Sequence, residues 1–543
     1  MMKKLYIAAL ALTAAALPTA AQDTYEGAKL MNDDLNGTAR YVGMGGAMEA
    51  LGADISTIGT NPAGIGLFRH SSISTSLGVV SQQDATKFDD LGKTNFSFDQ
   101  VGFVYTTRMD TKSFINVAFN YHKTRNFDQI LSAANSLRGA SLNKVGYAKY
   151  TKDNVNNGGY NLDFNSDGDL MGFENSSPDA YRANTFTQVD YLYMNAFNLD
   201  FDETGEAFIS FNDGDSYNFD RSHRGWIGDF DFNISGNIND RVYLGLTAGI
   251  RSVNYEGNSE YAENLLYVTP GTTGRTLLTD HRTIEGTGFD LKAGIIFRPV
   301  EYSPFRVGLS ISTPTWYELE SSNYTTLRYD WENAMTTNWS EGKNGETYKF
   351  KMYTPWKFDV SLGHTIGSML ALGATYEYAD YSATDIRVND GYDYYGNTDS
   401  YSDKVMNDQT DRALKGVSTF KVGAELKPDP AFAVRAGYNY VSPMYSDDGM
   451  RDATINSIGV MYSSTNDYVN WKSTNRITCG LGYKTGGWNI DLAYQYSQTN
   501  GTFYPFQPNT TFNEDGVHET NVPLSTEVSN KRHQVLLTLG YTF

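Results

Sequence analysis

The chain has 543 residues, a formal net charge of −20 and a single cysteine, Cys479. The negative charge argues against nucleic acid as a partner, because proteins attract nucleic acid through clustered Lys and Arg. One cysteine excludes an intramolecular disulfide framework. Aromatic residues make up 14% of the chain, and it contains 39 Tyr and 51 Gly. A Tyr-rich, Gly-rich, acidic chain whose apolar residues alternate with polar ones is typical of a transmembrane β-barrel.

The first 21 residues are predicted to be a secretory signal peptide. Lys3 and Lys4 precede an apolar run from Leu5 to Leu17, and small residues follow as far as Ala21. The apolar run is too short to span a bilayer, and the small residues form an A-x-A-like cleavage site. We therefore expect cleavage after Ala21 and export of the mature chain. No other apolar stretch approaches the roughly 20 residues that a membrane helix needs.

Residues 22–70 are rich in Gly and small apolar side chains and end in a turn-rich motif, Asn61-Pro62-Ala63-Gly64. Pro62 biases Asn61 toward an extended or turn conformation, and the Asn61 side chain can bond to nearby backbone groups. The segment is too small to build a large core of its own and too apolar to be left in solution. We predict that it folds inside the barrel, and we call residues 22–70 the plug segment.

Stretches of about 10 residues in which apolar and polar side chains alternate recur along the rest of the chain. The fourteen predicted strands are residues 71–81, 95–107, 113–124, 226–238, 241–256, 280–298, 304–318, 348–366, 369–382, 417–427, 431–442, 474–484, 487–499 and 532–543. An even number is what a single-chain bacterial barrel requires, and short connections alternate with long ones as periplasmic turns alternate with outer loops. We predict an all-β, fourteen-stranded antiparallel barrel, residues 71–543, in the outer membrane of a Gram-negative-type cell.

The longest predicted outer loop, 125–225, begins with apolar residues at helical spacing within "NFDQILSAANSLRGASL". We expect a short amphipathic helix over residues 127–138. Its apolar face either packs on neighbouring loops or serves as a first docking surface for an apolar ligand. The candidate docking residues are Phe127, Ile130, Leu131 and Leu137.

The same loop contains "DFNSDGDLMGFE", which fits the pattern of a calcium-binding loop, D-x-[DN]-x-[DN]-G-x₅-E. The candidate ligands are Asp163, Asn165, Asp167, Asp169 through its carbonyl, and Glu174. These groups supply the hard oxygen donors that Ca²⁺ prefers. The alternative is a solvated acidic turn, since loops rich in Asn, Asp and Gly are common without a metal.

No catalytic set emerges from the sequence. The seven histidines are scattered, and none belongs to a His-x-x-x-His pair or has a Cys partner that would indicate zinc. We therefore expect no enzymatic activity and no required cofactor beyond the possible structural Ca²⁺.

The last residues form an alternating strand that ends on an aromatic side chain, Phe543. Val535, Leu537, Leu539 and Tyr541 share its face. This ending resembles the terminal signal of outer-membrane barrels. It implies recognition of Phe543 by the barrel assembly machinery and a wall surrounded by outer-membrane lipid and lipopolysaccharide.

The segment "ARYVGMGGAMEALGADISTIGTNPAGIGLF", Ala39 to Phe68, resembles the N-terminal hatch of the FadL/TodX outer-membrane transporters. Asp54-Ile55-Ser56 and Asn61-Pro62-Ala63 match the pattern of that hatch. Further similar segments are "STPTWYE" (312–318), "YTPWKFDVSLGHTIG" (353–367), "YEYADYS" (376–382) and "VRAGYNYVSPMY" (434–445). The resemblance therefore spans most of the mature chain.

This resemblance implies passive uptake of hydrophobic small molecules, above all long-chain fatty acids. Ligand would dock among the outer loops, enter the barrel and meet the hatch. Release would follow a hatch shift or pass sideways through a gap that a kink in the third strand makes in this family. The third predicted strand, 113–124, has no Gly or Pro to mark such a kink. The alternative function is binding of haem or another ligand, or adhesion, through the outer loops.

Overall fold

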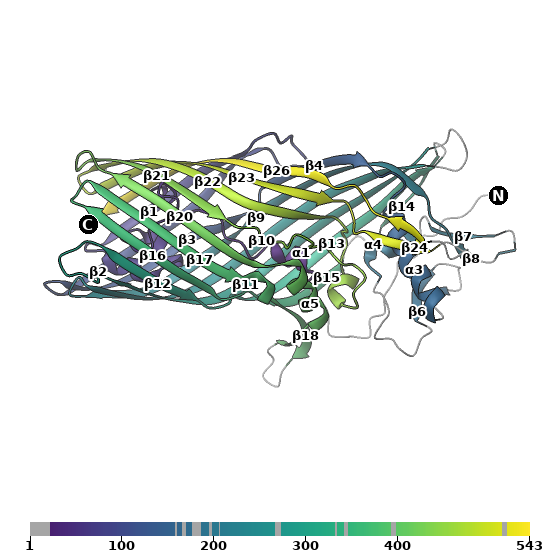
Figure 1. Cartoon of the computed structure of the whole chain (residues 1–543), viewed down its shortest axis with the longest axis horizontal. Coiled ribbons are helices and arrows are strands. Elements are labelled where there is room, and N and C mark those ends of the chain that lie inside the picture. The colour runs from purple at the N-terminus through teal and green to yellow at the C-terminus, as the bar shows by residue number, and fades with distance from the viewer. Residues whose placement is uncertain are drawn as a thin grey trace.

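The computed structural model describes residues 22–157, 160–164, 170–175, 186–194, 198–202, 204–205, 207–266, 273–331, 334–340, 346–392, 398–512 and 518–543. These residues form a long barrel with short turns and the C-terminus at one end and long excursions at the other (Figure 1). The two ends are called the turn end and the loop end. No helix among the described residues is long and apolar enough to cross a bilayer.

The wall is a closed antiparallel sheet with fourteen strand positions. Going round the barrel, these are β1 (Ser72–Gln82), β2 (Thr94–Asp110), β3 (Ser113–Asn126) continued by β4 (Gln129–Ser136), β9 (Asp213–Ile238), β10 (Val242–Leu266), β11 (Thr273–Phe297), β12 (Arg306–Ser312) continued by β13 (Trp316–Trp331), β16 (Lys357–Ile366) with β15 (Glu346–Tyr353), β17 (Leu370–Asp380) continued by β18 (Asp385–Tyr392), β20 (Gly416–Leu426), β21 (Phe432–Val441), β22 (Tyr468–Thr485), β23 (Trp488–Tyr504) and β26 (Thr526–Thr542). Pairing of β1 with β26, from Ser72 opposite Thr542 to Gln82 opposite Arg532, closes the ring. The predicted fourteen-stranded barrel is confirmed.

Alternation along the strands sorts side chains between the two faces of the wall. On β9, Phe232 and Ile234 are 52% and 58% exposed on the outside, whereas Asp231 between Phe230 and Phe232 is fully buried inside. Apolar side chains are exposed in the same alternating way on the other wall strands. A closed sheet with an apolar outer face and a polar interior is the architecture of a membrane-spanning barrel.

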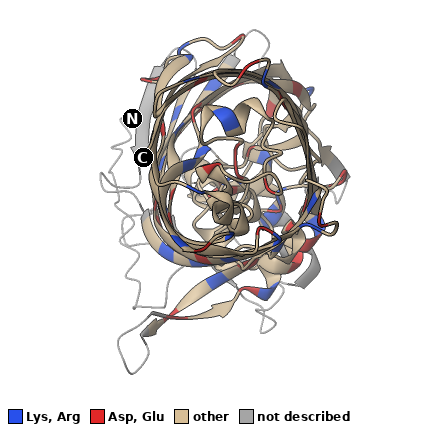
Figure 2. Cartoon of the chain, turned by 90° about the vertical axis from the view of Figure 1, so that its left-hand side faces the viewer, with Lys and Arg blue, Asp and Glu red and all other residues tan. Residues whose placement is uncertain are grey.

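The plug segment lies inside this ring, as the view from the turn end shows (Figure 2). It contains α1 (Thr24–Ala28), α2 (Ala39–Gly43) and the 3-10 turns η1 (Ile55–Gly59) and η2 (Pro62–Leu67). Wall side chains donate hydrogen bonds to its backbone carbonyls at distances of 2.7–3.2 Å, and they come from strands spread round the barrel. These donors are Asn116, Thr247, Arg306, Tyr381 and Thr478. The barrel therefore satisfies backbone groups that such short helical elements leave unpaired.

Glycines on the inner face let the plug backbone touch the wall. A Cβ added at Gly245 would lie 2.6 Å from the backbone nitrogen of Ala63, and one at Gly373 would overlap the carbonyl oxygen of Ala47. Because Cβ atoms do not tolerate such contacts with backbone, these positions require glycine for close approach rather than for a turn.

The remaining elements gather at the loop end. They are α3 (Asn143–Asn157), β5 (Tyr160–Phe164), β6 (Leu170–Asn175), α4 (Gln188–Tyr193), β7 (Leu199–Phe201), β8 (Ala207–Ile209), β14 (Ala334–Ser340), η5 (Tyr381–Ala383), β19 (Thr398–Ser402), α5 (Lys404–Ala413), α6 (Ile458–Met461), β24 (Asn509–Phe512) and β25 (His518–Asn521). Of these, α5 contacts α1 of the plug segment, so the loop end and the plug are joined directly.

The helix predicted over residues 127–138 is wrong, because residues 129–136 form strand β4. The strand β9 runs far past the end of β3, and β4 pairs with this extension from Gln129 opposite His223 to Ser136 opposite Ser216. An unpaired edge of β9 would expose a row of backbone donors and acceptors, so tertiary pairing outweighs the local helical spacing. The four candidate docking residues Phe127, Ile130, Leu131 and Leu137 are all buried.

The predicted calcium loop falls largely outside the described residues. Asn165, Asp167 and Asp169 are not described, and only the backbone of Asp163 and Glu174 is, within the antiparallel pair β5 and β6. The calcium site stays a prediction.

Candidate functional site

Two of the spaces between the plug segment and the wall share lining residues. The inner cavity has a volume of about 110 Å³ and is lined mainly by charged and polar side chains. The outer chamber, nearer the loop end, has a volume of about 150 Å³. Asp33 and Asp34 of the plug segment line both spaces, so these two residues lie between them.

Aromatic side chains close the outer chamber around α1. Tyr25 stacks on Tyr445 with ring centroids 5.2 Å apart and contacts Tyr468 at 5.1 Å. Phe127 and Trp471 complete the aromatic lining. Tyr25 also belongs to an apolar cluster that reaches across the barrel. Such rings bury large apolar areas while their hydroxyls stay paired, and that of Tyr25 donates to Asn470 Oδ1 at 2.8 Å.

Local chemistry fixes α1 in this position. Asp23 caps the helix by accepting from the backbone nitrogens of Tyr25 and Glu26. Asp23 also pairs with Arg451 of the outer loop that precedes β22. The hydroxyls of Thr24 and Thr410, on α1 and α5, lie 2.8 Å apart. The first helix of the plug segment is therefore held by loop-end residues.

Asp34 lies among three guanidiniums. Its carboxylate is 3.2 Å from Arg125 Nη1, 3.7 Å from Arg476 Nη2 and 3.8 Å from Arg532 Nη1. It also accepts from the backbone nitrogen of Asn126 at 3.0 Å. Burial alone would raise the pKa of Asp34, but the three arginines outweigh it and hold that pKa below its usual range. We call Arg125, Arg476 and Arg532 the arginine cluster. Among the described residues, all of its ion pairs end on this one carboxylate.

Asp33 turns instead toward other wall strands. It accepts from Arg251 at 2.9 Å and from Lys357 at 2.6 Å. Burial would raise the pKa of Asp33, and these two cations together lower it well below its usual range.

Behind Asp33 the charges continue into the wall. Arg251 also pairs with Asp229 and Asp290, and Lys292 pairs with Asp229, Asp231 and Asp290 at 2.9–3.2 Å. We call the four carboxylates Asp33, Asp229, Asp231 and Asp290 the acidic network. They pair with only three cations, Arg251, Lys292 and Lys357.

The Asn61-Pro62-Ala63-Gly64 motif opens η2 at the wall. Asn61 has an extended backbone (φ −111°, ψ 99°), and its Oδ1 accepts from the backbone nitrogen of Ala63 at 3.1 Å. Its Nδ2 donates to the carbonyl of Leu309 on β12 at 3.4 Å. The extended conformation and the local side-chain bond predicted from the sequence are confirmed. The motif anchors the plug segment and lines neither the inner cavity nor the outer chamber.

Sequence reasoning found one residue of this site, Phe127, which lines the outer chamber. Ile130, Leu131 and Leu137 are buried elsewhere, so the structure does not bring the four docking candidates together at the chamber. The charged groups were missed. Their signal was present, since Asp229 and Asp231 take inward positions of the alternating "GDFDFNIS" and so mark a charged lumen.

No family model matches this chain, and no curated protein matches it. Solved structures do. A Pseudomonas aeruginosa FadL homologue is 12% identical, with a TM-score of 0.46, over 94% of this chain and 100% of that chain. The Ralstonia pickettii toluene transporter TbuX is 12% identical, with a TM-score of 0.43, over 94% and 99%. The monoaromatic hydrocarbon channel CymD is 10% identical, with a TM-score of 0.45, over 94% and 98%.

Proposed function

We propose that this chain is an outer-membrane channel for passive uptake of hydrophobic small molecules, with long-chain fatty acids as its substrates. The observation that carries the proposal is the outer chamber, where an aromatic lining stands beside the arginine cluster. An aliphatic chain would pack on the rings, and a carboxylate would pair with the guanidiniums, which bind carboxylates in a forked geometry. The resemblance of Ala39–Phe68 to the FadL/TodX hatch supports the same function.

Charge balance favours an anionic substrate over a neutral one. Asp34 compensates only one of the three positive charges around it, so the arginine cluster keeps a net positive charge. This charge would attract the carboxylate of an incoming substrate before that carboxylate replaces Asp34. A neutral hydrocarbon would gain only the apolar contacts. We therefore expect the protein to prefer an amphipathic carboxylate to the uncharged compound with the same chain.

Uptake must move the plug segment. The outer chamber holds about 150 Å³, less than the roughly 300 Å³ at the lower end of small-molecule sites. Tyr25 and Ala28 of α1 pack in the apolar cluster beside the chamber. A substrate would enter as α1 withdraws, and its carboxylate would replace Asp34 on the arginine cluster.

Release would then follow plug displacement rather than a gap at the third wall strand. The strand β3 is paired with β2 from Ser113 to His122 and with β9 from Phe114 to Asn126. The β2–β3 and β3–β9 pairings each contain one register shift, and paired residues lie on both sides of it. Backbone pairing in the described wall therefore leaves no gap between β3 and its neighbours from Phe114 to His122.

Uptake by proteoliposomes tests the proposal. Purified protein carrying Cys479→Ser should transport labelled oleate faster than protein-free vesicles and faster than it transports oleyl alcohol. Thr24→Cys with Thr410→Cys would tether α1 to α5, because the hydroxyls to be replaced are 2.8 Å apart. Oxidation of this pair should abolish uptake, and a reductant should restore it.

The matched control is a disulfide that leaves the plug segment free. Ser81→Cys with Thr94→Cys joins β1 to β2, where the hydroxyls are also 2.8 Å apart, and should transport normally when oxidised. Equal uptake by the tethered and control proteins would contradict a channel opened by the plug. Haemin binding without oleate uptake would favour the rival function through the outer loops.

A further inference from the structure

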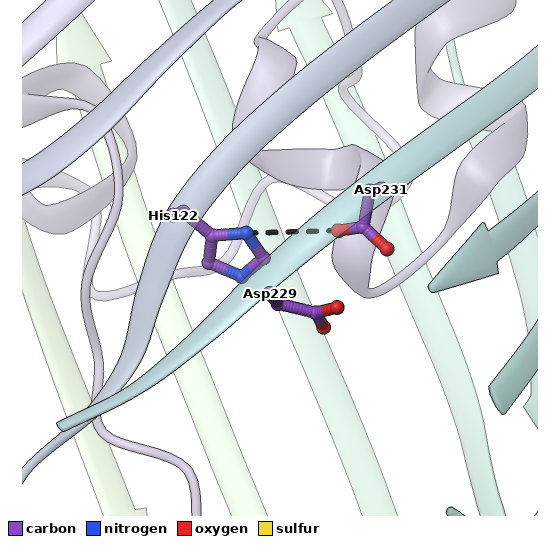
Figure 3. A group of neighbouring side chains, drawn as sticks. All are labelled: His122, Asp229 and Asp231. Atoms are coloured by element: carbon purple, nitrogen blue, oxygen red, sulfur yellow. Dashed lines mark ion pairs between the residues drawn. The ribbon is translucent and has the colours of Figure 1, made fainter. Parts of the chain in front are cut away.

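Two carboxylates of the acidic network and a neighbouring histidine point toward one another. His122 on β3 lies opposite Asp229 on β9, and Asp231 is two residues further along the same strand. Their imidazole and carboxylate ligand atoms all lie within 4.8 Å of one another, and all three residues are buried. Figure 3 shows the three side chains reaching toward a common space from the two neighbouring strands. We propose that His122, Asp229 and Asp231 bind a divalent transition-metal ion.

Lys292 orients the two carboxylates for this role. Its Nζ contacts Asp229 Oδ2 at 3.2 Å and Asp231 Oδ1 at 2.9 Å, which is one oxygen of each group. The other oxygens, Asp229 Oδ1 and Asp231 Oδ2, are buried and have no hydrogen-bond partner among the described residues. Asp231 Oδ2 lies 3.6 Å from His122 Nδ1, beyond hydrogen-bonding distance. A buried carboxylate oxygen without a partner is costly, and a metal ion would supply one. Metal-bound carboxylates are commonly held from behind in this way.

The charge of the surroundings calls for an added cation. The acidic network pairs four carboxylates with only three cations, and three of these carboxylates, Asp229, Asp231 and Asp290, are buried. Buried charges in proteins are paired or coordinate metals. Because the carboxylates outnumber the cations, a further positive ion would be attracted to the network.

The site has space for an ion and its water. His122 and Asp229 line the inner cavity of about 110 Å³, and a water molecule takes about 30 Å³. Gly59 of the plug segment faces the same point. A Cβ there would lie 3.1 Å from His122 Cε1, 3.2 Å from its Nε2 and 3.4 Å from Asp231 Oδ2. The absence of a side chain at Gly59 preserves the space in which the ligand atoms close on a metal.

The donor set selects the class of metal. One imidazole nitrogen with two carboxylate oxygens suits Zn²⁺, Ni²⁺, Mn²⁺ and Fe²⁺, whereas Ca²⁺ and Mg²⁺ prefer oxygen donors alone. Ligands of one such ion lie roughly 3.4 Å apart when the bonds are near 2.1 Å. The carboxylates would therefore rotate slightly inward on binding. The ion would tie β3 to β9 under Gly59 and would not touch the outer chamber, so the inference is independent of the proposed substrate.

Titration of the purified full-length protein with Zn²⁺ tests the site. We expect one equivalent to bind to wild type, and His122→Gln or Asp231→Asn to weaken this binding at least a hundredfold. His70→Gln is the matched control, because this histidine is exposed and does not line the inner cavity. Excess Ca²⁺ should not compete. With Co²⁺ in place of Zn²⁺, the visible absorption of a protein-bound ion should appear in wild type and be lost in His122→Gln.

Gly59→Ala gives a test that removes no ligand and no charge. Its added methyl group fills the space beside the imidazole, so Zn²⁺ should bind at least tenfold more weakly although the barrel still shows normal heat-modifiable migration. Wild-type protein that binds no Zn²⁺ would overturn the inference. So would equal affinities for wild type, His122→Gln and Gly59→Ala, or anomalous scattering that places the ion elsewhere.

Discussion

Asp33 and Asp34 are adjacent in the plug segment, yet they face opposite kinds of surroundings. Asp33 joins a network in which carboxylates outnumber cations, and Asp34 enters a cluster in which guanidiniums outnumber carboxylates. The ion pairs of Asp33, at 2.6 and 2.9 Å, are shorter than those of Asp34, at 3.2–3.8 Å. The electrostatic energy of a buried charge depends on all the charges around it. We therefore expect the contacts of Asp34, although longer, to stabilise the closed plug segment more than those of Asp33.

The difference in charge also gives the two sides of the lumen different roles. The Asp33 side offers negative charge to a cation and holds the plug segment to β10 and β16. The Asp34 side offers positive charge to an anionic headgroup at the edge of the aromatic chamber. Two adjacent residues of the plug segment therefore join a structural anchor to a contact that a substrate can replace.

The largest expected effect separates the two carboxylates directly. Asp34→Asn leaves three guanidiniums without a counter-charge, and we expect the plug segment to open more easily by about 2 kcal/mol, which is below the 3–5 kcal/mol for fully buried pairs because Asp34 is partly accessible. Asp33→Asn leaves Arg251 paired with Asp229 and Asp290 and takes from Lys357 its one ion-pair partner among the described residues, so it should cost less than Asp34→Asn. Native-state hydrogen exchange of residues 22–70 measures both. A larger cost for Asp33→Asn would show that contact distance, not charge balance, governs the anchor.

The sequence predicts the wall better than the lumen for a physical reason. Alternation marks each strand on its own, so all fourteen wall positions overlap the predicted segments. The edge that recruits β4 exists only after β9 has folded, and local spacing over 127–138 therefore indicated a helix. Arg125, Arg476 and Arg532 come together only when the barrel closes, and their common partner Asp34 lies hundreds of residues from two of them.

The second expected effect concerns substrate affinity. Arg476→Gln should weaken oleate binding about tenfold, because a hydrogen bond to a charged group contributes about 1.5 kcal/mol or more. Lys357→Met is the matched control on the Asp33 side and should leave oleate binding unchanged. Displacement of a fluorescent fatty acid measures both affinities. If Lys357→Met weakened binding as much as Arg476→Gln, the substrate would not distinguish the Asp33 side from the Asp34 side.

A smaller effect is expected for plug stability in the arginine cluster. Arg532→Gln removes one of three mutually repelling guanidiniums and leaves Asp34 with two partners. The opening free energy of the plug segment should change by less than about 0.5 kcal/mol, since the lost attraction and the relieved repulsion oppose each other. Hydrogen exchange of residues 22–70 provides the measurement. A loss as large as that of Asp34→Asn would mean that Arg532 alone holds the carboxylate.

The smallest expected effect is that of pH on the opening of the plug segment near neutral pH. Both carboxylates have a pKa lowered in the folded protein by their cations, against the opposing effect of burial. A group with a lowered folded-state pKa contributes stability that is fully present above its unfolded pKa, near 3.9, and is lost as the pH falls through the folded value. Plug opening should therefore be constant between about pH 5 and 8 and increase only below about pH 4.

Hydrogen exchange, corrected for the intrinsic pH dependence of the amides, should show this increase in wild type. Asp34→Asn, already open to a greater degree, should show a weaker acid response than Asp33→Asn, because the carboxylate whose protonation releases the arginine cluster is gone. Equal acid responses in the two variants would assign the pH dependence to groups other than Asp33 and Asp34.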